Sequence, residues 1–441
     1  MRELSHEALG TQPVGRLLWQ ACSQTTLSVG VYGIYALTNA WFVARGVGPG
    51  AMAAVNLVAP VLLILGAVAT TVGAGGASLV SRRLGAGDLT GAARAAGNAF
   101  AVFWTTAVVI TVTGLLAIEP LLTLLGARGE TRGAARDYAV IILAGSLVAT
   151  GFSSLVRAEG RMRYSTMIWV VAVLIQIVLD PLLIFGFHLG VRGAAFGTVG
   201  GQAVSAAMSV WFFFGQPRRP YEIGRADLRF HAPTVRALLG VGAPSFLAGF
   251  GATLLTVLVN NTLAVAGGAT ALAAYAVCAR IQTFARMPQL GISQGLQPIA
   301  GYNAGRRLDD RVQRAKTLAL RATVIYGTVV AAAAVFFAGP VVALFIDDGA
   351  TATTALRIIA VGTAFAGVAP LVSAFCQALG RAEPSYLISI GTLLAIKAPL
   401  VLDLSRAGAT GVWFALTLGE VVSAFAALAV LRRVRPRTPP G

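Results

Sequence analysis

Residues 51–76 read AMAAVNLVAPVLLILGAVATTVGAGG, an apolar run without a charged residue that decides the fold class. The run exceeds the roughly 20 apolar residues that a helix needs to cross a bilayer. It also lacks the alternation of apolar and polar residues that marks the strands of a transmembrane barrel. The whole chain has the same character, because 56% of its 441 residues are apolar and 12% are charged. A water-soluble protein carries about 25% charged residues, so the sequence predicts an all-α integral membrane protein and excludes soluble enzymes, disordered chains and fibrous proteins.

Similar apolar stretches cover most of the chain. Since connections in helical bundles are short, about twelve spans use up the length and leave no room for a large soluble domain. The stretches lie near residues 14–42, 51–78, 92–117, 134–156, 164–187, 191–215, 234–266, 269–300, 315–346, 352–379, 385–405 and 409–431. We therefore predict a first six-helix lobe over residues 1–215, a cytoplasmic linker over residues 216–233, a second six-helix lobe over residues 234–431 and a cytoplasmic tail over residues 432–441.

The basic residues are unevenly divided between the two sides of the predicted membrane. The net charge is +17, and 24 of the 34 Lys and Arg residues fall on the side that holds both termini. Basic residues concentrate on the cytoplasmic side of membrane proteins. We expect a multi-pass protein of the inner (plasma) membrane with both termini in the cytoplasm. The basic residues cluster between apolar stretches, so they indicate a lipid bilayer and no nucleic acid as partner.

The two halves of the chain resemble each other at one nearly constant offset. The matching positions include Gly160-Arg161 with Gly380-Arg381, Pro181 with Pro399, and Val204-Ser205-Ala206 with Val422-Ser423-Ala424. Single matches mean little in an Ala-rich chain, but several at one offset are hard to attribute to chance. Because six spans are an even number, both halves enter the membrane from the same side. We therefore predict two pseudo-symmetric lobes related as a parallel repeat.

Asp180 is the most informative ionisable residue, because it lies well inside a predicted span. A lone ionised carboxylate there costs roughly 2.5–3.5 kcal/mol even on the gentlest scale, so it must be protonated, paired or hydrated. One interpretation is an ion or proton site in a cavity, where Pro181 loosens the backbone; the other is a structural salt bridge. Gln176 lies one turn earlier on the same helix face, and Thr198 and Gln202 add polar groups in the next span.

Further ionisable residues fall inside or near the ends of the later spans, namely Arg280, Arg286, Lys397, Asp403 and Glu420. Arg280 is close enough to a helix end for its charge to reach the membrane surface, and Asp403 lies near the outer end of its span. Glu420 aligns with Gln202 in the repeat and is either a structural hydrogen-bonding group or a coupling group. Lys397 aligns with the position next to Asp180, so it is either a counter-charge in a cavity or a lipid-facing side chain.

Motifs of enzymes are missing from the sequence. His6, His188 and His231 are too far apart for a metal-binding pair, and the three cysteines lie in separate apolar stretches and suggest neither a disulfide framework nor a metal site. The GxxxxGK[ST] phosphate loop does not occur. We predict that the protein is not an enzyme, needs no metal or organic cofactor, and draws its energy from an ion gradient.

Several short stretches resemble the multidrug and toxic compound extrusion (MATE) family in order and spacing. They are Trp41-Phe42-Val43, Leu79-Val80-Ser81-Arg82, Arg157-Ala158-Glu159-Gly160, Leu179-Asp180-Pro181, Gly291-Ile292-Ser293-Gln294-Gly295-Leu296-Gln297-Pro298, Gly301-Tyr302-Asn303-Ala304-Gly305 and Gly411-Val412-Trp413. The resemblance covers nearly the whole chain and is similar to the DinF-like bacterial branch. It implies two six-helix lobes around a central cleft and the export of a drug or small organic metabolite driven by inward H⁺ or Na⁺.

The same resemblance implies an ion-coupling site in the first lobe. By position, the acid of the fifth helix falls on Asp180, its amide neighbour on Gln176, the sixth-helix hydroxyl on Thr198, and the fourth-helix amide on Ser153 or Ser154. The acid of the first helix in that branch falls on Asn39, and the seventh-helix Glu of NorM-like members falls on Ala252. One titratable group would remain, so we expect one proton per cycle at Asp180, with Na⁺ coordination as the alternative.

The substrate of such an exporter is expected to be a small organic compound, with organic cations among the candidates. Candidate residues of the substrate cavity are Gln202, Asn260, Arg286, Gln294 and Lys397. The family resemblance implies a monomer. A second hypothesis keeps the fold but makes the protein a flippase for lipid-linked saccharides, which would need a cationic cavity; Arg286 and Lys397 suit it, and Asp180 does not.

Overall fold

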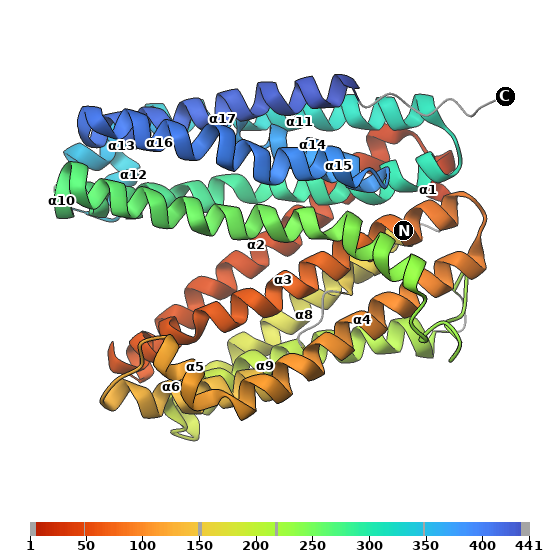
Figure 1. The fold of residues 1–441 in the computed structure, drawn as a ribbon, viewed down its shortest axis with the longest axis horizontal. Coiled ribbons are helices and arrows are strands. Elements are labelled where there is room, and N and C mark those ends of the chain that lie inside the picture. Colours follow the sequence, from red (N-terminus) through yellow and green to blue (C-terminus); the bar gives the residue numbers. More distant parts are fainter. Residues whose placement is uncertain (1–5, 48, 149–151, 217–218, 347–348, 434–441) are drawn as a thin grey trace. The chain divides into compact units, whose positions relative to one another are not determined.

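The computed structural model describes residues 6–47, 49–148, 152–216, 219–346 and 349–433. Across these residues the regular secondary structure is helical, without strands (Figure 1). Eight segments are long and apolar enough to cross a membrane. Two of them contain two helices each, because α10 (Ala232–Gly305) turns at Gly268 and the segment Ala382–Arg433 turns at Gly408. Together with α2 and α9, the described residues therefore contain the twelve membrane helices that the sequence predicts.

The helices before residue 216 include three that are long and continuous and three that are interrupted or end in a π-helical turn. In chain order they are α1 (Ala8–Thr11), α2 (Val14–Gly46), α3 (Pro49–Gly85), α4 (Leu89–Leu116), α5 (Ile118–Leu124), α6 (Glu130–Ala144), η1 (Gly145–Val148), α7 (Ser153–Ala158), α8 (Met162–Pro181), η2 (Leu182–Gly186), α9 (Gly190–Val210) and η3 (Trp211–Gly215).

The helices after residue 231 follow the same order of long and short elements. They are α10 (Ala232–Gly305), α11 (Asp309–Phe336), α12 (Ala338–Ala343), α13 (Ala350–Ala366), α14 (Val368–Ala378), α15 (Ala382–Tyr386), η4 (Leu387–Gly391), η5 (Leu393–Lys397), α16 (Ala398–Leu404), η6 (Ser405–Ala407) and α17 (Gly408–Arg433).

The helix limits repeat in the two halves as the sequence predicts. Both α4 and α11 have 28 residues, and each is followed at once by a short helix. Gly160 and Gly380, which match in the sequence repeat, both take a positive φ, of 83° and 71°. Glycine adopts this left-handed conformation without the steric cost that a side chain would add. The structure thus confirms the internal repeat at the level of helix ends and turns.

Two compact units make up the chain, and their limits differ from the predicted lobes. Unit 1 comprises Met1–Ala8 and Leu27–Gly242, and unit 2 comprises Leu9–Thr26 and Ala243–Gly441. The first half of α2 therefore belongs to unit 2, and the first turns of α10 belong to unit 1. The sequence placed the first of these segments in the first lobe and the second in the second lobe.

Close helix approaches explain both differences. Within unit 2, the Thr25 hydroxyl donates a hydrogen bond to the Gly291 carbonyl oxygen over 2.6 Å. If Gly295 were replaced by a residue with a side chain, the new Cβ atom would lie only 2.9 Å from the Cys22 nitrogen, so the two helices approach closely here. Within unit 1, a Cβ atom at Gly242 would overlap the Thr71 carbonyl oxygen of α3. Small residues let helix backbones touch in membrane proteins, and these contacts attach each segment to a unit that chain order alone does not indicate.

Each unit has its own apolar core. In unit 1 the fully buried side chains include Val58, Leu122, Ile142 and Leu143, and they join α3, α5 and α6. In unit 2 the corresponding cluster joins α10, α12, α13 and α17 around residues such as Leu263, Leu356, Val342 and Trp413. Each unit is therefore held together by contacts of its own helices.

The predicted linker is not a free loop where the structure describes it. The buried Arg219 guanidinium pairs with Glu159 over 2.5 Å, and the Tyr221 hydroxyl donates to the same carboxylate over 2.6 Å. Burial, and then the charge of Glu159, raise the pKa of the Tyr221 hydroxyl well above its usual value. The Asn98 amide donates to the carbonyl oxygen of Asp227 and accepts from the His231 backbone nitrogen. These bonds fix the described part of the linker to unit 1.

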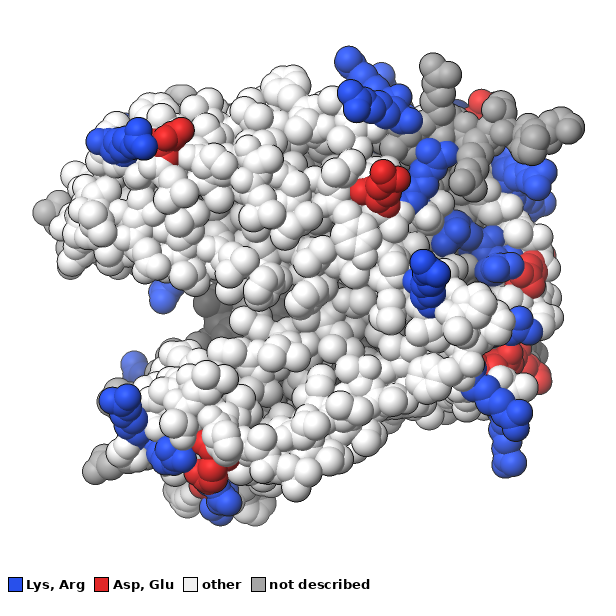
Figure 2. Space-filling model, viewed as in Figure 1, with Lys and Arg blue, Asp and Glu red and all other residues white. Residues whose placement is uncertain are grey.

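Charged side chains lie mainly near the ends of the helices in each unit. The middle of the helices that face the viewer in Figure 2 is almost entirely uncharged. The apolar middle and charged ends match the requirements of a bilayer, so the protein is a multi-pass membrane protein.

Candidate functional site

Asp180 is buried inside unit 1 near the end of α8. The residue is 1% exposed, and its Oδ1 atom accepts no hydrogen bond from the described residues. A Cβ atom at Gly197 of α9 would overlap this oxygen, so the glycine provides the space that the carboxyl group occupies. None of the salt bridges among the described residues includes Asp180. The carboxyl group is therefore enclosed by the protein without a basic partner in the described part of the chain.

A row of glycines on α9 brings this helix against α8. Gly193, Gly197 and Gly201 recur every four residues, so they lie on one helix face. A Cβ atom added to Gly193 would lie 2.9 Å from the Leu183 carbonyl group, and one added to Gly197 would overlap the Asp180 carboxyl group. A Cβ atom added to Gly201 would lie 2.9 to 3.1 Å from Ala172 and Gln176. Such rows of small residues allow close packing of membrane helices. The row positions α9 directly over the polar face of α8.

Gln176 and Thr198 each lie next to residues of this helix contact. Gln176 is 6% exposed, and its Oε1 atom lies 3.1 Å from the position of a Cβ atom at Gly201. Thr198 follows Gly197 on α9 and is also buried. The hydroxyl group of Tyr138, from α6, interacts with Thr198 and lies within electrostatic range of Asp180. Tyr138 was not predicted, because no spacing in the sequence shows that α6 approaches α8 and α9 here.

Ser153 does not join this group. Its hydroxyl oxygen accepts a hydrogen bond from the indole nitrogen of Trp169 over 2.9 Å. Trp169 lies eleven residues before Asp180 on α8, which corresponds to about 16 Å along a helix. The expectation that Ser153 shares the Asp180 site is corrected, because the structure places its hydroxyl group at a different level of the unit.

Asn39 lies on the second half of α2, in unit 1. The end of this helix contacts η2, since the rings of Phe42 and Phe185 are 6.4 Å apart and a Cβ atom at Gly46 would lie 2.9 Å from the Phe185 ring. Phe185 follows Asp180 by five residues. The structure therefore brings the α2 segment that contains Asn39 close to the chain segment that follows Asp180.

Unit 2 contains an ionic group around the buried carboxylate of Glu420, which we name the C-lobe triad: Arg286, Lys397 and Glu420. Glu420 Oε1 accepts from Arg286 Nη2 and Glu420 Oε2 accepts from Lys397 Nζ, both over 2.9 Å. The Arg286 guanidinium also contacts Gln282 Oε1 at 3.4 Å. The three charges come from α10, η5 and α17. Glu420 is therefore an ion-paired group, and Lys397 has its counter-charge within unit 2.

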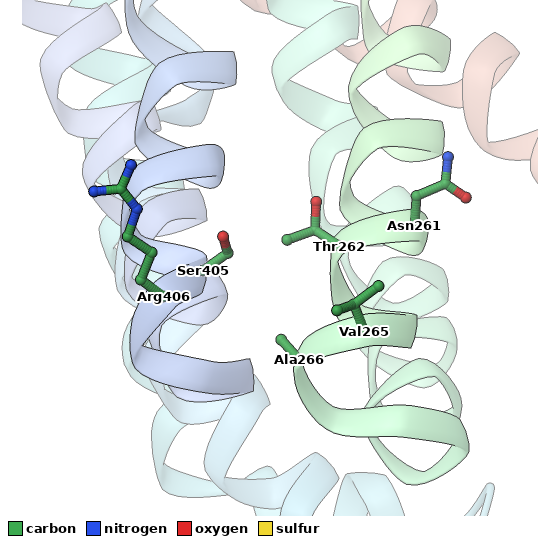
Figure 3. Close-up of a pocket in the computed structure, with 6 residues that line it drawn as sticks. All are labelled: Asn261, Thr262, Val265, Ala266, Ser405 and Arg406. Carbon is green, nitrogen blue, oxygen red and sulfur yellow. The ribbon is translucent and has the colours of Figure 1, made fainter.

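The other candidate cavity residues are Gln202, Gln294 and Asn260. Gln202 and Gln294 are half-buried on α9 and α10, and Asn260 is exposed on α10. A pocket of about 470 Å³ in unit 2 (Figure 3) is lined by Asn261, Thr262, Val265, Ala266, Ser405 and Arg406, and not by Asn260. It is formed within unit 2 by the end of the first helix of α10 and by η6.

The outer face of α8 is apolar. A shallow depression of about 260 Å³ there is lined by Leu174, Ile175, Val178 and Leu179. Leu174 and Val178 are 56% and 63% exposed, in contrast to Asp180. The exposed face of α8 is therefore aliphatic, and the carboxyl group of Asp180 lies on its buried face. Within the described ranges no cluster of three or more His, Cys, Asp or Glu side chains is arranged to hold a metal ion.

Two similar sets of membrane helices, each with a buried ionic residue, define a helical membrane transporter built on an internal repeat. The chain belongs to the MatE family. The sequence model of this family matches residues 26–182 and again residues 244–402. The two matches start and end at equivalent places in the two halves, in agreement with the repeat in the helix limits.

Similar proteins are known from sequence and structure. The multidrug export protein MepA of Staphylococcus aureus (strain NCTC 8325 / PS 47) is 29% identical over 430 residues, which cover 94% of this chain and 91% of that protein. A solved structure described as the outward-facing conformation of a multidrug resistance MATE family transporter of the MOP superfamily is 26% identical, with a TM-score of 0.90 and 98% of each chain covered. A MOP superfamily transporter from Pyrococcus furiosus, described as having a binding pocket of reverse polarity that suggests a different function, is 25% identical, with a TM-score of 0.91 and 98% of each chain covered.

Proposed function

We propose that this chain is a secondary active exporter that moves drugs or small organic metabolites out of the cell in exchange for protons by alternating access. Membership of the MatE family and similarity to a multidrug export protein over 94% of the chain support the export of small organic compounds. The observation that carries the proton step is the buried carboxyl group of Asp180, which has an unbonded Oδ1 atom and no basic partner among the described residues.

The proton step follows from the cost of a charge in this place. An ionised carboxylate inside a membrane span costs at least several kcal/mol unless it is paired or hydrated. Binding of one proton removes the charge, and the neutral carboxyl group can remain in the enclosed space beside Gly197. The charged form needs water or a cationic ligand nearby. Asp180 therefore couples its protonation to the opening of unit 1 toward water or substrate.

We infer that proton and substrate compete for the same state of Asp180. A proton that enters from outside neutralises the carboxyl group and favours the closed form of the site, so substrate is released. Loss of the proton to the cytoplasm restores the charge and favours rebinding. A ligand shifts such an equilibrium only by its difference in affinity for the two states, and the carboxylate supplies this difference for a cationic substrate.

Sodium is the second candidate ion, because the site offers oxygen atoms. Asp180, Thr198, Gln176 and Tyr138 bring carboxylate, hydroxyl and amide oxygens to the contact of α8 with α9 and α6. Hard cations bind oxygen ligands of these kinds. We favour the proton, because one proton neutralises a single carboxyl group by itself, whereas a bound Na⁺ ion needs several oxygen ligands around it.

The experiment uses everted membrane vesicles that contain the protein and a fluorescent cationic dye, ethidium. Respiration acidifies the vesicle interior, and we expect dye uptake that nigericin abolishes and that a sodium-free buffer leaves unchanged. Asp180→Asn should lower the uptake rate at least about tenfold, a change of about 1.4 kcal/mol in the barrier. The matched control is Asp403→Asn, because the Asp403 side chain is 73% exposed and its pairing with Arg406 at 3.7 Å is that of a weak surface pair.

Two results would reject the proton mechanism. Uptake at the wild-type rate by Asp180→Asn would remove Asp180 from the coupling step. Uptake that requires sodium and survives nigericin would replace the proton by Na⁺ at the same residue.

The membrane placement follows the charge distribution. We propose an inner-membrane location with both termini in the cytoplasm, supported by the 24 basic residues on that side. We also propose that the monomer, which contains both lobes in one chain, is the transporting unit and that no organic cofactor or resident metal takes part.

A further inference from the structure

The C-lobe triad carries more positive than negative charge. One carboxylate, Glu420, faces two cations, Arg286 and Lys397, each at 2.9 Å. The triad therefore contains one more cationic than anionic side chain. Such an excess at membrane depth is costly unless another anion or water compensates it.

The triad lies far from both helix ends. Glu420 is twelve residues after the start of α17 and thirteen before its end, which corresponds to about 18–20 Å in either direction. Arg286 lies eighteen residues after the turn at Gly268 and nineteen before the end of α10, or about 27 Å in either direction. Neither group lies near a helix end, so an anion or water beside the triad is needed to compensate the excess charge.

The two cations still have free donors. Arg286 uses Nη2 for its bonds to Glu420 and Gln282, while its Nε atom is buried without a hydrogen-bond partner among the described residues. A guanidinium has five N–H donors and an ammonium has three. The side chains of Arg286 and Lys397 are 38% and 21% exposed, whereas that of Glu420 is 11% exposed. The cations, rather than the carboxylate, are thus the accessible part of the triad.

The surroundings of the triad include aromatic and small residues. Tyr275 lies within electrostatic range of Arg286 and stacks on Trp413, with ring centroids 6.3 Å apart. Gly419 gives Lys397 room, because a Cβ atom there would lie 3.3 Å from Lys397 Cγ. An anionic group on an aromatic body would find cations and rings in the same part of unit 2.

We propose that Arg286 and Lys397 bind the anionic group of an organic substrate, such as a carboxylate, sulfonate or phosphate, in competition with Glu420. Arginine pairs with such groups through parallel N–H bonds, and lysine adds a point charge. When the site is empty, Glu420 holds the two cations together. When the anion binds, it takes over bonds from Glu420 and neutralises the excess charge. The inference rests on the proposed export function and extends its substrates from cations to anions and zwitterions.

The test measures equilibrium binding, so that it does not depend on transport or on an ion gradient. The purified protein in neutral detergent is dialysed against radiolabelled 2-naphthoate, and 2-naphthylmethylammonium serves as the cationic probe with the same rings. We expect Lys397→Met and Arg286→Met each to weaken naphthoate binding about tenfold or more. Glu420→Gln should strengthen it by a similar factor, because the internal competitor is removed.

Controls separate a binding role from a structural one. Arg280→Gln removes a cation from the same helix that lies outside the triad and should leave binding unchanged. If Glu420→Gln does not give a monodisperse protein, the exchange Lys397→Glu with Glu420→Lys keeps two cations and one anion, and it should bind naphthoate within about threefold of wild type. Asp403→Asn changes an exposed acid outside the triad and should bind naphthoate as the wild type does. Because binding in detergent needs no ion gradient, a failure of the coupling mechanism and a failure of this site are distinguishable.

The binding and competition measurements test the proposal and identify the source of the anion. Competition by soluble carboxylates assigns the site to a free organic anion, whereas displacement only by short-chain phosphatidylglycerol assigns it to a lipid headgroup. The proposal is overturned if wild-type protein does not bind naphthoate, if Lys397→Met and Arg286→Met both retain wild-type affinity, or if the cationic probe binds equally well with the same response to the variants.

Discussion

The two units have repeated helices but differ in the ionic groups within their membrane helices. In unit 1 a single carboxyl group, Asp180, is buried without a basic partner among the described residues, whereas in unit 2 a single carboxylate, Glu420, is shared by two cations. The repeat cannot account for this difference, because Glu420 aligns with the amide Gln202 and Asp180 with Ala398. The scaffold therefore tolerates either sign of charge. This difference underlies our proposals that unit 1 binds a proton or cation and that unit 2 binds an anion.

We expect the largest difference between the two units in the loss of folding stability when the acidic residue of each is replaced by its amide. Glu420→Gln leaves two half-buried cations without their carboxylate, and loss of one partner from a buried ionic group costs up to about 3–5 kcal/mol. Asp180→Asn removes no ion pair and should cost less than about 1 kcal/mol, because the original oxygen already lacks a partner among the described residues. The measurement is the temperature at which each purified variant loses its monodisperse peak in size-exclusion chromatography. Equal losses in the two variants would show that Asp180 has a stabilising partner and would remove the contrast between the units.

Part of this contrast could be predicted from the sequence. The helix number and the repeat follow from hydropathy and from matches at one offset, and both properties are local in the chain. Asp180 was identified because a lone acid in an apolar run is costly, and Gln176 because helical spacing puts it on the same face. Thr198 was placed by the family resemblance, and the structure puts it on α9 directly after Gly197, next to Tyr138 of α6.

The remaining features depend on contacts between distant helices. Arg286 and Glu420 are 134 residues apart in sequence, and no periodicity indicates that they pair. Ser153 lies apart from Asp180 because its hydroxyl group is held by Trp169, which has no polar signature in the sequence. Tyr138 reaches Thr198 only because α6 packs beside α9. Pairing across a membrane bundle is set by helix rotation, which one sequence does not specify.

Gly197 lies beside Asp180 and Gly419 beside Lys397, so replacing each glycine by alanine compares the space around the two groups. Gly197→Ala places a methyl group on Asp180 Oδ1, and overpacking of this kind costs about 1–3 kcal/mol. Gly419→Ala places one 3.3 Å from the flexible Lys397 side chain and should cost less than about 1 kcal/mol. We expect Gly197→Ala to lower dye export as well, because the carboxyl group must move, while Gly419→Ala leaves cationic dye export intact. A normal export rate for Gly197→Ala would mean that the position of the carboxyl group beside α9 is unimportant.

The smallest expected difference lies at the starts of α4 and α11, outside the membrane. Asp88 is the N-cap of α4, with φ −85° and ψ 78°, and its Oδ1 atom accepts from the Gly91 nitrogen over 2.7 Å. The equivalent N-cap of α11 in the second half is Leu308, with φ −93° and ψ 68° but no side-chain hydrogen bond. Asp88→Ala should lower stability by about 1 kcal/mol, as for other lost N-caps, and Leu308→Ala should lose no capping energy.

The dependence of this difference on pH separates a cap from simple packing. The hydrogen bond from the Gly91 backbone, and then Arg83, lower the pKa of the Asp88 carboxyl group below its usual value of 3.8. A group with a lowered pKa in the folded state stabilises the protein above its unfolded pKa, and this contribution is lost as the pH falls through the folded value. The melting difference between wild type and Asp88→Ala should therefore be constant from pH 7 to about pH 4 and shrink at lower pH. A difference that persists unchanged in acid would indicate that the methyl-for-carboxylate exchange acts through packing, and the two helix starts would then be equivalent in spite of their sequences.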